Sequence, residues 1–122
     1  MSYSDPVRVT YTQKGVDFTG SAATDLKVAG PSGMVGRVVS VSVGITTAVT
    51  VAASTVLVGT VADTDAYASL AVPVQAINTT ANNPTIYTDD DNLIPADSLV
   101  VIGNGGGSTA GVGDVSVVID WF

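Results

Sequence analysis

Hydrophobic and polar residues alternate over several short stretches of this chain, which is the pattern of half-buried β-strands. The clearest stretch is residues 114–121, where apolar side chains occupy the odd positions up to Trp121. Polar side chains occupy the even positions, with Val118 as the exception. We therefore expect a strand over residues 114–121 whose odd-numbered side chains, Trp121 included, face the core.

The same alternation predicts further strands. In residues 36–44 valine alternates with serine, which makes this the clearest early strand. Two later apolar stretches are separated by little more than Ser54, so we expect a bulge or a tight bend there. Strands are expected over residues 36–44, 48–53, 55–62, 74–77, 85–88 and 98–102.

Three other segments are interpreted differently. Residues 19–24 are small and polar and predict a loop. Residues 63–71 fit either an extended segment or a short helix capped by Asp63, and Pro73 would end such a helix. Residues 103–113 are rich in glycine and predict a long connector that is mobile or ordered only by a neighbour.

Between Arg37 and Asp63 the sequence has no charged residue, and hydropathy alone would indicate a membrane span. Valine alternates there with serine and threonine, so the period is that of strands, and we expect no membrane partner. About eight short strands separated by turn residues predict an all-β fold. The expected architecture is an antiparallel β-sandwich, with a jelly roll as one form of it.

A chain of 122 residues predicts a single domain. We expect a short N-terminal arm over residues 1–15, followed by one β-sandwich domain over residues 16–122. Residues 7–11 also alternate, so the alternative is that they form an edge strand of the sandwich. The first residues lack the basic and apolar regions of a secretory signal peptide, and we expect no such signal.

Charged residues make up 12% of the chain and hydrophobic residues 46%. The charged share is about half of that in an ordinary soluble domain, so we expect other subunits to cover part of the surface. The net charge of −7 sets eleven aspartates against Arg8, Lys14, Lys27 and Arg37. Four dispersed cations cannot neutralise a phosphate backbone, which argues against a nucleic-acid partner.

The chain has no histidine, no cysteine and no glutamate. It therefore lacks the usual general base and the thiol nucleophile, and we expect no enzyme, no catalytic residue and no cofactor. Residues 103–113 lack the Gly-Lys-Ser/Thr ending of a phosphate-binding loop.

Two acidic groups are candidates for a cation site. Residues 89–91 are three consecutive aspartates before Asn92, and Ca²⁺ takes several oxygen ligands. The spacing is not that of an EF-hand loop, so a solvated turn is favoured. Asp63 and Asp65 would share one face of an extended segment, or one of them would cap a helix. We therefore predict no metal site.

The segments GRVVSVSVG (36–44), TVLVGTVADTDAYASL (55–70) and GVGDVSVVIDWF (111–122) follow a short N-terminal stretch without a signal. In this style the chain resembles small structural proteins of tailed-bacteriophage virions, above all the head decoration (cement) proteins. The resemblance implies a β-rich homotrimer, made in the host cytoplasm, that binds the major capsid protein on the outer capsid surface. It carries over no catalytic residue. The alternative is a glycan- or Ca²⁺-binding module of a fibre, tail or knob, although the aromatic residues are scattered.

On this interpretation the N-terminal arm contacts the shell. Arg8 and Lys14 are two of the four cations and would engage an acidic strip. The aromatic pair that ends the sequence is expected in the core or under a partner. The predicted interface residues are Val7, Arg8, Val9, Tyr11, Lys14, Trp121 and Phe122.

Overall fold

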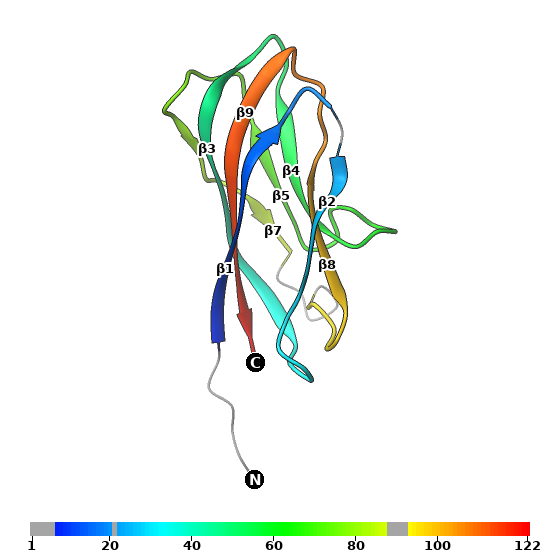
Figure 1. The fold of residues 1–122 in the computed structure, drawn as a ribbon. Helices are drawn as coiled ribbons and strands as arrows, with labels where there is room; N and C mark the ends of the chain where they lie inside the picture. Colours follow the sequence, from blue (N-terminus) through cyan, green and yellow to red (C-terminus); the bar gives the residue numbers. More distant parts are fainter. Residues whose placement is uncertain (1–6, 21, 88–92) are drawn as a thin grey trace.

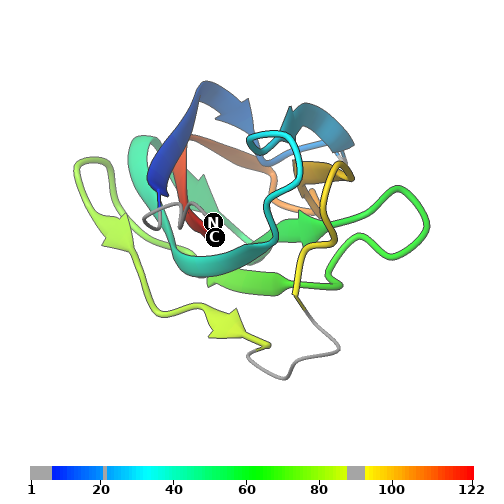
Figure 2. The same ribbon diagram turned by 90° about the horizontal axis from the view of Figure 1, so that it is seen from below.

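The computed structural model describes residues 7–20, 22–87 and 93–122, with residues 22–25 described by their backbone alone. Two antiparallel sheets pack face to face (Figures 1 and 2). The described residues contain no helix, and so they include no helix that could span a membrane. The predicted all-β sandwich is confirmed, while its jelly-roll form stays a prediction.

Within the described residues, nine strands make up the two sheets. The first sheet has the order β1-β9-β3-β6, and the second has the order β2-β8-β4-β5-β7. The strands are β1 (Val7–Asp17), β2 (Ala22–Ala29), β3 (Gly36–Thr50), β4 (Ser54–Gly59), β5 (Ala68–Val72), β6 (Thr80–Ala81), β7 (Thr85–Ile86), β8 (Leu99–Asn104) and β9 (Ala110–Trp121).

The core lies between the sheets, and β9 supplies one side of it. Every second residue of β9 is buried, from Val115 to Trp121, and these side chains are at most 2% exposed. The inward phase predicted for residues 114–121 is therefore confirmed. Valines of β3 and β4, the ring of Phe18 and side chains of β5 and β8 also belong to the core, which is built mainly from β-branched side chains.

Residues 7–15, expected in an N-terminal arm, lie in β1 instead. This strand pairs with β9 from Val7 opposite Trp121 to Asp17 opposite Val112. The alternative of an edge strand therefore describes the structure. The pairing follows from the matching alternation of the two segments, because each places its apolar side chains on the same side of the sheet.

The glycine-rich stretch is not a long connector. Gly103 and Asn104 end β8, and β9 begins at Ala110, so only residues 105–109 join them. Glycine serves here for close approach: a Cβ on Gly113 would lie 2.7 Å from Val43 Cγ1. The prediction was wrong because strand glycines that permit close packing have the same composition as a loop.

Other expected elements also differ. The predicted strand 36–44 and residues 48–50 of the predicted strand 48–53 are parts of one long strand, β3, whose register shifts three times against β9. Residues 51–53 lie in the connection between β3 and β4. Residues 74–77 form only an isolated bridge between Gln75 and Val49. Residues 63–67 form a turn before β5, so the extended interpretation of residues 63–71 is the nearer one, and the predicted loop 19–24 contains the start of β2.

One end of the sandwich is a tip made of three connections: the turn 18–20, the β3–β4 connection 50–54 and the loop 105–109 (Figure 1, top). Backbone hydrogen bonds join them. The N–H of Ser108 donates to Phe18 O over 3.2 Å, and the N–H of Thr109 donates to Thr50 O over 3.2 Å. The hydroxyl of Ser108 donates to Ala52 O over 2.7 Å. These bonds tie the three connections into one unit.

Candidate functional site

The structure divides the predicted interface residues between a surface and the core. Along β1, Arg8 points outward from the first sheet, while Val9 and Tyr11 are half-buried and pack against the core. Trp121 is 1% exposed, so it is a core residue and offers no surface. Val7 and Phe122 are 42% and 45% exposed and lie at the end of the sandwich opposite the tip.

The outer face of the first sheet is the surface that β1, β9 and β3 form together, and we call it the β1–β9–β3 face. Three rows of side chains cross it in register. The first row is Arg8, Asp120 and Arg37; the second is Thr10, Val118 and Ser40; the third is Thr12, Ser116 and Ser42.

The first row is an ionic row. Arg8 Nε and Nη2 donate to the two carboxylate oxygens of Asp120 over 2.7 and 2.9 Å. This hydrogen bonding and the positive charge of Arg8 hold the pKa of Asp120 below its ordinary value. Arg37 flanks Asp120 on the other side, and its guanidinium lies 5.8 Å from the ring centre of Phe122. Arg8 is therefore engaged within the sheet, as a planar bidentate pair.

The second and third rows carry no charge. Their side chains are hydroxyls and one valine, and Thr12 Oγ1 lies 3.2 Å from Ser116 Oγ. These rows on a central strand and its two neighbours therefore carry no long side chain. Such side chains also lose little rotamer entropy when a partner covers them.

The electric charges of this face balance. β1, β9 and β3 hold three cations, Arg8, Lys14 and Arg37, and three aspartates, Asp17, Asp114 and Asp120. Lys14 is exposed next to Gly15, whose N–H donates to Asp114 Oδ1 over 3.0 Å. The net charge of −7 is therefore carried by the rest of the chain. A neutral face on an acidic protein is where a second acidic macromolecule approaches with the least repulsion.

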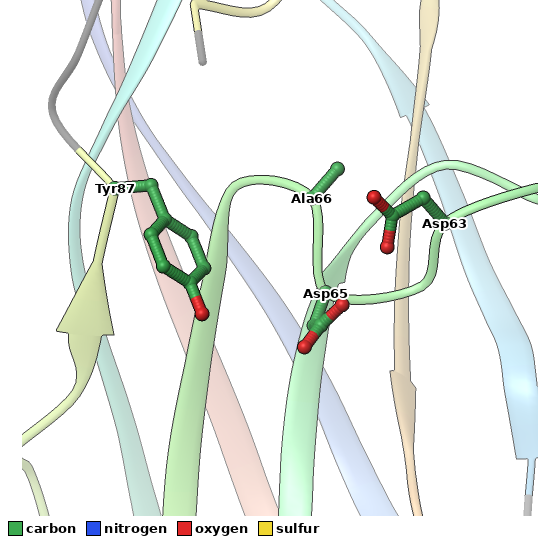
Figure 3. Close-up of a pocket in the computed structure, with 4 residues that line it drawn as sticks. All are labelled: Asp63, Asp65, Ala66 and Tyr87. Carbon is green, nitrogen blue, oxygen red and sulfur yellow. The ribbon is translucent and has the colours of Figure 1, made fainter.

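Two hollows lie away from this face. The first is lined by Asp63, Asp65, Ala66 and Tyr87 (Figure 3), with both carboxylates on the β4–β5 connection. The neighbouring carboxyl of Asp65, with a smaller contribution from desolvation, raises the pKa of Asp63 above its ordinary value. Within the described ranges no group of three or more acidic, histidine or cysteine side chains gathers that could hold a metal ion. Asp89–Asp91 lie outside the described residues.

The second hollow, which we call the uncharged hollow, has a volume of about 320 Å³. It lies where β5 of the second sheet faces β6 of the first. It has no ionisable group: its lining is Ala71, Pro73, Thr80, Ala81, Asn82 and Asn83.

Sequence reasoning missed the threonine and serine rows of the β1–β9–β3 face. The polar parity of residues 8–12 was visible in the sequence, but its pairing with β9, about a hundred residues away, was not. The uncharged hollow was also missed, because nothing local in residues 71–83 indicates that two sheets meet there.

Comparison with known proteins adds no family to these observations. No protein-family model matches the sequence, and no curated protein matches it.

Proposed function

We propose that this protein is a structural component of a tailed-phage virion. It binds the outer surface of the capsid as a homo-oligomer and stabilises contacts between subunits of the major capsid protein. The observation that carries the proposal is the neutral β1–β9–β3 face on a chain whose net charge is −7. The resemblance of the sequence to decoration proteins supports the same function.

The physical basis is binding without chemistry. The centre of a protein–protein interface is depleted of charged residues, and the two uncharged rows share this lack of charge. A protein that binds only the assembled shell shifts the equilibrium toward that shell by mass action. An oligomer that presents several copies of the face gains affinity from multivalency.

The structure changes the contact surface that the sequence suggested. Residues 7–15 belong to β1, and Arg8 is paired with Asp120. The contact proposed here is therefore a strand face, with Arg8 at its ionic row, in place of a free basic arm.

A binding experiment with undecorated particles tests this proposal. The wild-type chain should co-sediment with the particles and raise the temperature at which they release their genome. Ser42→Arg places a long cation in the third row and should weaken binding at least tenfold. Ser69→Arg is the matched control, because Ser69 is a half-buried residue on the outer face of the second sheet.

The outcomes separate the parts of the proposal. If the wild-type chain does not bind particles, the proposed function is wrong. If the wild type binds and both variants bind equally well, the function stands but the β1–β9–β3 face is not the contact.

The glycan-binding alternative has one supporting feature. Tyr87 is 41% exposed beside the carboxylates of Asp63 and Asp65, and an aromatic ring beside carboxylates is a composition that can bind sugars. A glycan-array signal from the free protein that Tyr87→Ala abolishes would favour this alternative.

A further inference from the structure

Val51 lies in the β3–β4 connection 50–54 with an unusual exposure and backbone conformation. It is 80% exposed, and its φ of 72° lies in the left-handed region. A β-branched side chain rarely adopts that region, where glycine, asparagine or aspartate is usual. The chain thus presents an apolar side chain to solvent on a backbone that disfavours it.

Hydrogen bonds hold the β3–β4 connection, and with it Val51, in place. The N–H of Ala52 donates to Thr50 O over 2.9 Å, while Thr109 and Ser108 of the loop 105–109 donate hydrogen bonds to this connection. Val51 and its neighbours Ala52 and Ala53 are all exposed, and none carries a charge. Residues 51–53 therefore form a hydrogen-bonded, uncharged knob. A knob that is already held in one conformation loses little conformational entropy when it is buried.

The uncharged hollow is the matching surface on the same chain. It is lined by apolar Ala71, Pro73 and Ala81 and by the polar but uncharged side chains of Thr80, Asn82 and Asn83. The connection after Pro73 adds two exposed apolar residues, Val74 and Ile77, at 53% and 54% exposure. Its volume of about 320 Å³ has room for an isopropyl group and the methyl groups beside it.

Charge selects this hollow over the other. The hollow at Asp63 and Asp65 would place an apolar knob against two carboxylates. Two copies that each carry a charge of −7 repel each other, so they approach most easily where neither surface is charged. A chain cannot fill its own hollow in this way, because its Val51 remains exposed.

We propose that Val51 of one copy inserts into the uncharged hollow of a second copy. This inference rests on the homo-oligomer of the proposed function and names the contact between its copies. Knob and hollow are different surfaces, so the contact has two closed forms. Either two copies exchange knobs reciprocally across a two-fold axis, or the contact repeats head-to-tail and closes into a ring when the rotation between neighbours permits.

Native mass spectrometry of the full chain at micromolar concentration tests the contact. The wild type should form a closed oligomer, either a two-fold dimer or a ring of three or more copies. Val51→Asp charges the knob on a backbone that aspartate tolerates, and Ala71→Glu charges the exposed lining of the hollow. Each variant alone should be monomeric, with the dissociation constant raised at least 100-fold.

Mixing the two variants gives the sharpest result. The Val51→Asp chain keeps an intact hollow, and the Ala71→Glu chain keeps an intact Val51. The mixture should therefore form a one-to-one heterodimer that grows no further. Val61→Asp is the matched control, because Val61 is 65% exposed and belongs neither to the knob nor to the lining of the hollow. This variant should leave the oligomer intact.

Circular dichroism checks that the variants fold, and Asn83→Lys replaces Ala71→Glu if the latter does not. Three outcomes would each overturn the inference: the wild type is monomeric, the oligomer survives Val51→Asp, or the mixture of the two variants forms no heterodimer. None of these outcomes decides the proposed function, because binding of the wild type to particles is a separate measurement.

Discussion

The indole of Trp121 packs between the backbones of two glycines. A Cβ on Gly36 would lie 2.6 Å from Trp121 Cζ3, and a Cβ on Gly30 would overlap the same ring. Neither glycine has a left-handed φ, so space and not backbone conformation requires glycine at both positions. The largest buried side chain of the core therefore depends on two residues that have no side chain.

We expect Gly36→Ala to lower the free energy of unfolding by about 1–3 kcal/mol, because the added methyl group overpacks the site of Trp121. Gly44→Ala is the control in the same strand. Nothing lies within 4 Å of its Cβ position, so it should be neutral or should stabilise by about 0.5–1 kcal/mol. Urea unfolding measures both values, and equal effects would contradict the packing account.

The pair of Asp63 and Asp65 gives a pH-dependent prediction. The pKa of Asp63 is raised in the folded chain, so the folded state binds this proton more tightly than the unfolded state. The shift therefore costs stability above the raised pKa and costs nothing where both states are protonated. We expect Asp65→Asn to raise the melting temperature slightly at pH 7 and to leave it unchanged near about pH 3. An equal change at both pH values would show that the effect is not electrostatic.

Among the elements, β1 stabilises β9 through a side-chain contact as well as through its backbone. The indole N–H of Trp121 donates to the hydroxyl oxygen of Tyr11 over 3.0 Å. We expect Tyr11→Phe to lower the free energy of unfolding by about 1–3 kcal/mol, because a buried donor loses its acceptor. Tyr87→Phe, at an exposed tyrosine, should change it by less than about 0.5 kcal/mol. Thermal and urea unfolding of both variants give the comparison.

Strands that alternate cleanly could be predicted from the sequence, and β9 and the first part of β3 are examples. Their signal is local, because alternate side chains of one strand face the core. The position of β1 was not predictable in the same way. Its alternation was visible, but the strand that it pairs with lies at the other end of the sequence.

The same limit applies to the candidate site. The residue types on the β1–β9–β3 face were visible, but the rows exist only once three strands from distant segments are in register. Gly111 and Gly113 illustrate the converse difficulty. Both lie in β9, where a Cβ would meet Val49 or Val43, yet their composition predicted a connector.

For the whole molecule, the pairing of the first and last strands bears on the rate of folding. Val7 and Trp121 are partners although almost the entire chain separates them. Pairing between distant segments slows folding, so we expect refolding to take about 1 ms to 1 s or longer. Trp121 is the single tryptophan, and its fluorescence after dilution from urea reports the closing of this contact. Full recovery of the signal within the dead time of stopped flow would contradict this expectation.

The antiparallel pairing of β1 with β9 also fixes how the molecule responds to mechanical load. Residue 7 and residue 121 are direct partners at one end of the sandwich, so force applied between them pulls the two strands apart like a zipper, one hydrogen-bonded pair at a time. Force applied between the tip and that end runs along the strands and loads many hydrogen bonds together. The protein is therefore soft when pulled by its first and last strands and stiff along its length.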